Sequence, residues 1–128
     1  MVLQVELVSP ERILYSGEAD MVVCRTVDGG EVAFLTGHAP FLGALETGLV
    51  RVKTAGGEQV AAVHGGFVEV RDNRVIVLSD VAELAADVDV ARAQRAKDAA
   101  AAAAGDDPET LAARARADAR LNAANRAT

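Results

Sequence analysis

The chain has 128 residues, which is enough for one ordinary domain or for a small domain with an appendage. Hydrophobic residues make up 51% of it and charged residues 25%, so its composition excludes an intrinsically disordered chain. The net charge is −6 and no basic block is present, which argues against nucleic acid as a partner.

Residues 1–6 contain neither a basic segment nor a long apolar one, so we expect no signal peptide. No window approaches the roughly 18 consecutive apolar residues that a membrane span needs. We therefore expect a soluble, cytosolic protein without direct membrane insertion. Cys24 is the only cysteine, so there is no disulfide framework, and we interpret it as a small buried hydrophobic residue.

Residues 1–86 are rich in valine and in turn-forming residues. Several runs alternate between apolar and polar positions, which is typical of half-buried strands. These runs include residues 3–7, 21–27, 49–53, 59–64 and 74–78. Asp72 and Asn73 tolerate a left-handed backbone, and this predicts a hairpin between two of the strands. We predict an all-β sandwich or flattened barrel of about ten short strands.

In residues 29–48, turn-forming residues and apolar residues alternate more closely than in any other stretch of the sequence. Gly29 and Gly30 allow the chain to reverse, and Pro40 interrupts the strand that follows. Two apolar groups are expected to be buried, first Val32, Phe34 and Leu35 and then Phe41, Leu42 and Leu45. Gly48 is expected to turn the chain again. We interpret this stretch as a shaped contact surface.

The composition changes near Asp87, because alanine supplies seventeen of the forty-one residues from Val88 to Thr128. Alanine is the best helix former, and two helices are predicted. Asp87 or Asp89 caps the first, which runs to about Ala104 and ends at Gly105. Asp107 caps the second, with Pro108 in its first turn. Residues 87–128 are thus predicted to form a second domain, an antiparallel helical hairpin, which makes the fold class α+β.

Alanine side chains bury little area, so the contact between these helices is predicted to be weak. The expected interface is Ala96, Ala100, Ala112, Ala115 and Ala119. Such a hairpin suits an arm that changes position, although a general alanine bias of the sequence would produce the same composition. Residues 1–87 have a net charge of −7, whereas residues 88–128 have a net charge of +1. The basic side chains of the arm could therefore bind an acidic surface. The alternative is a solvated helix face with local pairs such as Arg114 with Asp118.

No catalytic constellation stands out in the sequence. His38 and His64 are the only histidines, and no metal-binding spacing is present, so we predict no metal site. His64 is interpreted as structural. For His38, a contact role and a hydrogen bond that stabilises a turn are both open. A small hydrolase that uses one of these histidines with a carboxylate is kept as an alternative.

An ordered set of short motifs resembles the epsilon subunit of F-type ATP synthases. The motifs are Gly30-Glu31-Val32, Gly37-His38-Ala39-Pro40, Gly65-Gly66-Phe67-Val68-Glu69-Val70, Val75-Ile76-Val77-Leu78-Ser79-Asp80 and Asp89-Val90-Ala91-Arg92-Ala93. The resemblance implies a non-catalytic subunit of the central stalk that couples proton flow to ATP synthesis. It also implies a peripheral place on the cytoplasmic face of the membrane, where the sandwich would bind the gamma subunit and the c-ring.

The resemblance further implies roles for single residues. Glu31 and His38 would lie near the gamma and c-ring contacts. The helical arm would either fold on the sandwich or extend towards the catalytic alpha and beta subunits, where Arg114, Arg116 and Arg120 could inhibit ATP hydrolysis.

Residues 88–93 resemble the motif by which some epsilon subunits hold ATP. Asp89 would accept from the adenine amino group or the ribose, and Arg92 would pair with phosphate. No cofactor is required, and ATP would act as a regulatory ligand. The alternative is that Asp89 only caps a helix and that Arg92 is solvated. A free-standing β-sandwich binding module with a helical tail remains the alternative to the whole assignment.

Overall fold

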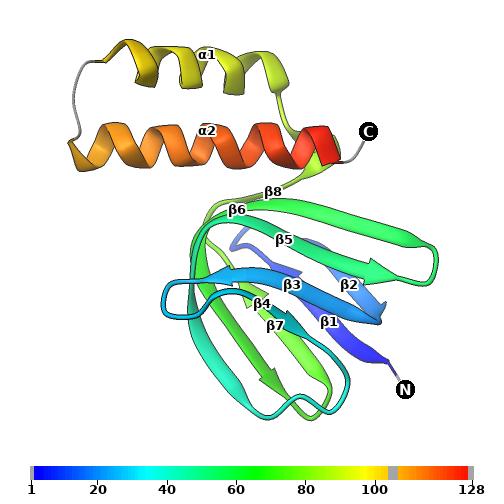
Figure 1. The fold of residues 1–128 in the computed structure, drawn as a ribbon. Coiled ribbons are helices and arrows are strands. Elements are labelled where there is room, and N and C mark those ends of the chain that lie inside the picture. Colours follow the sequence, from blue (N-terminus) through cyan, green and yellow to red (C-terminus); the bar gives the residue numbers. More distant parts are fainter. Residues whose placement is uncertain (1, 104–106, 127–128) are drawn as a thin grey trace.

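The computed structural model describes residues 2–103 and 107–126, which form a β-sandwich with two helices at one end (Figure 1). The strands are β1 (Leu3–Val8), β2 (Ile13–Ala19), β3 (Met21–Thr26), β4 (Gly30–Phe34), β5 (Phe41–Thr54), β6 (Gly57–Arg71), β7 (Arg74–Leu78) and β8 (Ala82–Leu84). A 3₁₀ turn, η1 (Ala85–Asp87), leads to α1 (Val90–Ala102) and α2 (Pro108–Arg126). The predicted fold class is therefore confirmed.

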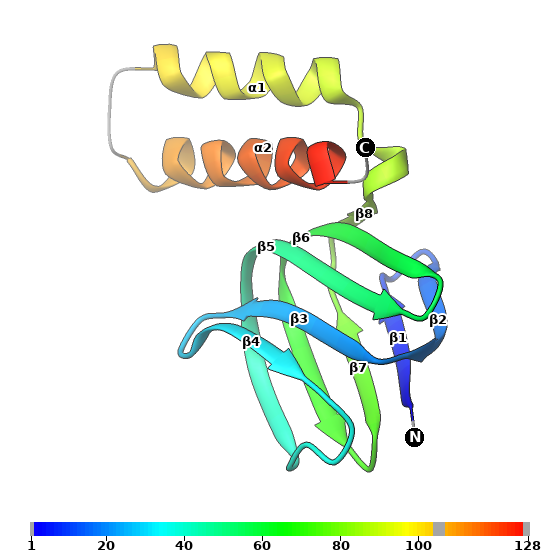
Figure 2. The same ribbon diagram turned by 45° about the vertical axis from the view of Figure 1, so that its right-hand side comes forward.

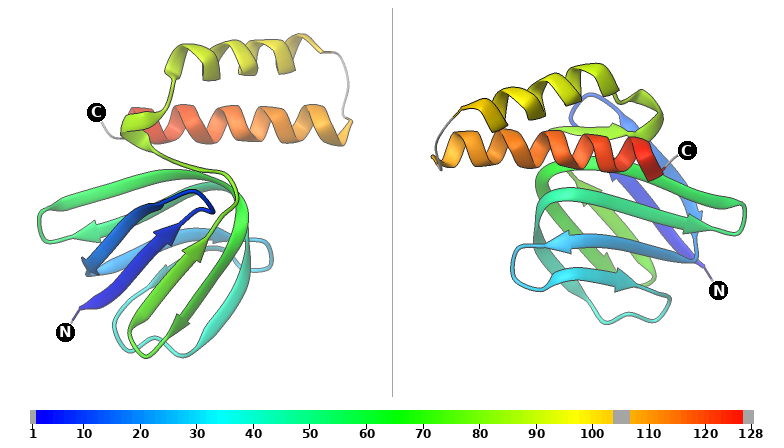
Figure 3. Two further views of the ribbon diagram at one scale, coloured as in Figure 1. Left: turned by 180° about the vertical axis from the view of Figure 1, so that it is seen from behind. Right: turned by 45° about the horizontal axis from the view of Figure 1, so that its top comes forward.

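Seven of these strands follow the order β2-β1-β7-β6-β5-β3-β4, and β8 pairs with β6. All neighbours are antiparallel except β1 and β7, which run parallel. The strands β5 and β6 have 14 and 15 residues and pair along most of their length. They curve from the helix-bearing end of the sandwich to the opposite end (Figures 1 and 3). Each of these two strands spans two of the short strands expected from the sequence. The described residues therefore form eight strands, whereas about ten were predicted.

The bend in β6 depends on two glycines. Gly65 and Gly66 have φ values of 89° and 123°, in the region that disfavours other residues. A Cβ atom on Gly66 would lie 2.1 Å from the carbonyl oxygen of Leu78. The buried hydroxyl of Ser79 donates a hydrogen bond to Gly65 O at 2.7 Å. On one side of this bend β6 pairs with β8, and on the other side it pairs with β7.

The main core is built from valine and leucine, as the near absence of aromatic residues requires. It includes Leu3, Val5, Leu7, Val22, Cys24, Phe34, Val50, Val52, Val63, Val68, Val70, Val75 and Val77. Phe34 is the largest side chain that is fully buried, and its ring lies 5.4 Å from the ring of Phe41. Asp72 and Asn73 have φ values of 50° and 58°, so the predicted hairpin turn between β6 and β7 is confirmed.

Three expectations for residues 29–48 are wrong. Leu42 is 70% exposed, because it follows the inward-facing Phe41 in β5 and side chains alternate along a strand. Leu35 is 49% exposed and lies just after the end of β4. Gly48 does not turn the chain. It lies inside β5, where it pairs with Val63.

The helix caps agree with the sequence. Asp89 caps α1 by accepting a hydrogen bond from Arg92 N at 3.0 Å. The carboxylate of Asp107 accepts hydrogen bonds from the hydroxyl and the backbone amide of Thr110. These two hydrogen bonds hold the pKa of Asp107 below its ordinary value. Pro108 is the first residue of α2. The expected end of the first helix at Ala104 and Gly105 lies outside the described residues.

The second helix lies between α1 and the sandwich, and the two helices run in opposite directions (Figures 1 and 2). The contact of α2 with the sandwich is a separate small cluster of Val60, Ala62, Ala85, Ala119 and Ala123, with Leu49 against it. The alanine interface predicted for the helices agrees with the structure only in part. Ala119 is buried as expected. Ala96 and Ala115 are exposed, whereas Ala93 and Ala117 are buried.

The strands end at Leu84 and α1 begins at Val90, on the two sides of the predicted domain boundary. The division into domains 1–86 and 87–128 stays a prediction. In the part of the chain that the structure describes, neither helix is long and apolar enough to cross a membrane.

Candidate functional site

A cleft of about 270 Å³ lies between α1 and α2. One stripe of α1 contributes Asp89, Arg92, Ala93 and Ala96, and one stripe of α2 contributes Ala113, Arg116 and Arg120. Spacings of three, four and seven residues place side chains on one face of a helix, and here two such faces meet. The small alanines leave room, and the three arginines provide positive charge. The cleft is therefore suited to an anion.

The structure brings both predicted ATP-binding residues, Asp89 and Arg92, to the rim of this cleft. Asp89 is also the cap of α1, through its oxygen Oδ1. Capping and ligand binding by Asp89 therefore do not exclude each other, since the cap uses only the oxygen Oδ1 of a residue that also lines the cleft.

The three predicted arm arginines have different environments. Arg114 is exposed. Arg116 donates to Glu109 at 3.1 Å, within α2. Arg120 donates from Nε to Glu83 on β8 at 2.6 Å, which ties α2 to the sandwich. The suggested local pair of Arg114 with Asp118 is wrong, because Asp118 lies 3.2 Å from Lys97 of α1.

His64 lies beneath this contact. It belongs to the face of β6 that also carries Val60 and Ala62, the residues that α2 covers. Its Nε2 atom is 3.7 Å from the same oxygen of Glu83 that accepts from Arg120. Burial and then the charge of Arg120 lower the pKa of His64, while Glu83 opposes them. With a side chain that is 3% exposed, His64 is out of reach of a substrate, which argues against the hydrolase alternative for this residue.

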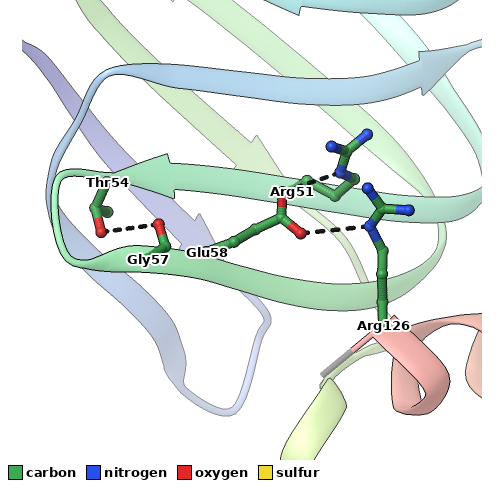
Figure 4. A network of polar contacts seen from close by, with 5 residues as sticks. All are labelled: Arg51, Thr54, Gly57, Glu58 and Arg126. Carbon is green, nitrogen blue, oxygen red and sulfur yellow. Dashed lines mark hydrogen bonds and ion pairs between the residues drawn. The ribbon is translucent and has the colours of Figure 1, made fainter. Parts of the chain in front are cut away.

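A second ion-pair contact ties the end of α2 to the sandwich (Figure 4). Arg126 donates from Nε to Glu58 Oε1 at 3.3 Å. The other oxygen of Glu58 accepts from Arg51 of β5 at 3.2 Å. Glu58 thus joins β5, β6 and α2. We call the pairs Arg120–Glu83 and Arg126–Glu58 the two arm contacts.

The predicted subunit-contact residues lie elsewhere. His38 belongs to the loop between β4 and β5, which lies at the end of the sandwich opposite the helices (Figure 1). Its Nδ1 atom donates to Ala39 O at 2.7 Å, and its ring stands edge-on to Phe34 at 4.9 Å. The loop is held to the β6–β7 turn, since Gly37 N donates to Asn73 at 2.7 Å. This loop is therefore rigidly shaped.

Glu31 lies at the start of β4, paired in register with Arg25 of β3, and it is exposed. The structure thus places Glu31 near the start of β4 and His38 after its end, and does not bring them into one cluster. The exposed side chains of Leu35 and Leu42 flank the His38 loop. The sequence interpretation missed them as surface residues, although alternation along β5 was a signal for Leu42.

Other residues of the site were also missed. Glu58 and Glu83 are the partners of Arg126 and Arg120 across 68 and 37 residues of sequence, and no local pattern marks such pairs. The run Val60-Ala61-Ala62-Val63 is buried at every position, which indicates a strand covered on both faces. This signal could have located the surface on which α2 lies.

The chain is similar to known proteins over nearly its whole length. The family described as "ATP synthase, Delta/Epsilon chain, beta-sandwich domain" matches residues 2–85. An ATP synthase epsilon chain of Streptomyces griseus is 46% identical over 122 residues, which are 94% of each chain. One of Thermobifida fusca is 49% identical over 126 residues, covering 95% of this chain and 91% of the relative.

Solved structures show the same fold. A chain of the Euglena gracilis mitochondrial ATP synthase superposes with a TM-score of 0.73 at 21% identity, over 98% of this chain and 81% of that one. A chain from the central stalk and c-ring of the Tetrahymena thermophila mitochondrial ATP synthase superposes with a TM-score of 0.59 at 17% identity. The match covers 98% of this chain and 96% of that one.

Proposed function

The chain belongs to the family of ATP synthase delta/epsilon chains, and we propose that it works as the epsilon subunit in the central stalk of a rotary ATP synthase. The observation that carries this is the extent of the similarity to curated epsilon chains, which continues from the sandwich through the helices. In this role the chain would help to couple proton flow to ATP synthesis and would perform no chemistry itself.

The proposed partners are the gamma subunit and the c-ring for the sandwich, and the catalytic alpha and beta subunits for the helices. The rigid loop around His38, with Leu35 and Leu42 exposed beside it, supports a protein contact at that end of the sandwich. Exposed large apolar side chains of this kind are typical of protein interfaces. The complex would hold the chain at the cytoplasmic face of the membrane.

Co-purification tests this assignment. A tagged chain should bring down the gamma subunit and the c-ring from detergent extracts, and Leu42→Asp should weaken their recovery. Ile13→Asp is a matched control, because Ile13 is 61% exposed but begins β2, which carries neither Glu31 nor the His38 loop. Recovery of the tagged chain alone would favour the free-standing binding module.

We further propose that the cleft between α1 and α2 binds ATP as a regulatory ligand. Arg92, Arg116 and Arg120 would meet the phosphates, and Asp89 would accept from the adenine or the ribose. A volume of about 270 Å³ lies just below the usual ~300–1,000 Å³ of small-molecule sites, so the cleft would enclose only part of the nucleotide. Weak, millimolar binding is the expected result.

Calorimetric titration of the full chain with ATP tests this second proposal. Arg116→Gln should abolish saturable binding because it removes a cation from the cleft. Arg114→Gln is the matched control, since Arg114 is an exposed arginine of the same helix that does not line the cleft. The absence of saturable binding at millimolar ATP, or equal binding by both variants, would remove ATP as a ligand of this cleft.

The helices are also proposed to regulate ATP hydrolysis. In the structure Arg120 is engaged by Glu83 on the sandwich. An arm that extended towards the catalytic subunits would have to break both arm contacts before Arg120 could act there together with Arg114 and Arg116. Docking on the sandwich and inhibition are therefore expected to exclude each other.

A further inference from the structure

His64 is a titratable group sealed beneath α2. Its side chain is 3% exposed, and within the described residues neither ring nitrogen has a hydrogen-bond partner. A buried polar group without a partner is costly, because it loses its hydrogen bonds to water and gains none in return. Released from beneath α2, the ring would recover hydration. Docking of the arm therefore removes the ring of His64 from water.

The charged groups that face the ring come from two elements. Glu83 of β8 lies 3.7 Å away, and Arg116 and Arg120 of α2 act on the ring through their charge. On β5, the residue paired with His64 is the uncharged Thr47. Glu83 is already bonded to Arg120 at 2.6 Å. A protonated ring would thus be repelled by the charges of two arginines. The carboxylate of Glu83 would offset this repulsion only in part, because Arg120 already neutralises most of its charge.

We propose that His64 is a proton-sensitive latch of the helical arm: the arm docks over the neutral ring, and protonation of the ring at mildly acidic pH releases the arm. This inference rests on the proposed role of the arm as a movable regulatory element. The released state keeps Glu83 beside His64 but removes both arginines, so it is the state that accommodates an imidazolium ion.

The direction of the pH dependence follows from the pKa of His64 in the two states. In the docked state burial first, and then Arg120, lower the pKa of His64 from its ordinary 6.5. In the released state the pKa returns to its ordinary value or above, because Glu83 favours the charged ring. The released state therefore binds the proton more tightly. Docking is at full strength above the ordinary pKa and weakens as the pH falls below it.

Thiol protection measures this equilibrium in the full-length chain. Leu49 is partly buried against the cluster that α2 covers, so the thiol of Leu49→Cys should react more slowly while the arm is docked and faster when it opens. Its labelling rate is divided by that of Ala55→Cys, an exposed position in the turn that follows the same strand, which corrects for the pH dependence of the thiol itself. Cys24 stays silent, because it is buried in the main core.

We expect the protection factor to be constant above about pH 7 and to fall below the ordinary pKa of histidine by up to about tenfold per pH unit, the limit for one proton. His64→Gln should remove this slope, because glutamine is neutral throughout. His38→Gln should keep it, since His38 lies at the opposite end of the sandwich. A slope that survives in His64→Gln, or a wild-type chain without a slope, would overturn the proposal.

Histidine NMR of the unaltered chain gives a second measurement that needs no variant. The chain has two histidines, and resonance assignment through the backbone distinguishes the ring signals of His64 and His38. The ring of His64 should titrate below the ordinary histidine pKa of 6.5, and a pKa above that value would overturn the proposal. Both measurements use the isolated chain, so their failure would leave co-purification and ATPase regulation untouched. Failure of those assays would likewise leave a pH-dependent arm standing.

Discussion

Gly66 is the residue on which the bend of β6 depends. Its positive φ disfavours any side chain, and an added Cβ would collide with the backbone of Leu78. Gly66→Ala should therefore lower the free energy of unfolding by about 2–4 kcal/mol, since backbone strain and a steric clash add. Urea denaturation of the full chain measures this change.

The control is Gly56→Ala. Gly56 lies in the turn between β5 and β6, where an added Cβ would have nothing within 4 Å. Its effect should stay within about 0.5 kcal/mol, as for most surface substitutions. Equal urea midpoints for the two variants would show that the clash at Gly66 is relieved by a small backbone shift.

Cys24 should be inert in the folded chain. Burial raises the pKa of its thiol to about 12, and the thiolate is the reactive form. At pH 8 a thiol reagent should therefore modify Cys24 no faster than the chain unfolds, and should modify it at once in guanidinium chloride. Fast modification of the native chain would mean that the main core opens locally around β3.

Single residues were predictable where their role is local. The caps Asp89 and Asp107 and the turn residues Asp72 and Asn73 act within a few positions of the chain, and the structure confirms them. The neighbours of His64 were not predictable, because β8 and α2 meet it only in the folded chain.

At the scale of elements, the two arm contacts decide how firmly α2 lies on the sandwich. Exposed ion pairs contribute about 0.2–1 kcal/mol each, and shorter, less exposed pairs contribute more. Arg120–Glu83 is 2.6 Å long with side chains 26% and 28% exposed, whereas Arg126–Glu58 is 3.3 Å long with side chains 44% and 27% exposed. The first contact should be the stronger.

Two matched variants test this order. In the Leu49→Cys chain, Arg120→Gln should lower the protection factor by about two- to fivefold, the equivalent of roughly 0.4–1 kcal/mol. Arg126→Gln should lower it by less, and 0.5 M salt should narrow the difference. A larger effect of Arg126→Gln would indicate that Glu58, with Arg51 already bound to it, is the main anchor of the arm.

The elements themselves were predictable to different degrees. Local propensity and capping fixed the two helices, because both signals lie within each helix. The continuity of β5 and β6 was missed at Gly48 and at the Gly65-Gly66 bend, since a glycine inside a strand and a glycine in a turn look alike in sequence. The packing of α2 on β5 and β6 depends on three-dimensional contacts, so only the apolar run at residues 60–63 pointed to it.

At the scale of the molecule, two separate clusters divide the chain. The large cluster lies wholly within β1 to β8, and the small one joins α2 to the outer face of β5 and β6. Losing the helices would thus expose the apolar side chains of Leu49, Val60, Ala62 and Ala85 on the sandwich side, together with the ring of His64. The main core of the sandwich contains no residue of the helices, so we expect that displacement of the arm would leave the sandwich folded.

Deletion of residues 88–128 tests this division directly. The remaining chain should keep a cooperative urea transition, with a loss of about 1–3 kcal/mol because a few apolar side chains become exposed to water. It should also still join the ATP synthase, since the His38 loop and the strands are unchanged. A chain without a cooperative transition would show that the small cluster is part of one common core.

The same deletion tests inhibition in the assembled enzyme. If the extended arm blocks hydrolysis, ATPase activity of a complex with the shortened chain should rise, by about twofold where half of the arms are extended, because only the extended fraction inhibits. The matched variant is Glu83→Gln in the full-length chain, which breaks the stronger arm contact and favours extension. It should lower the activity. A rise with both variants, or no change with either, would contradict a model in which docking and inhibition compete for Arg120.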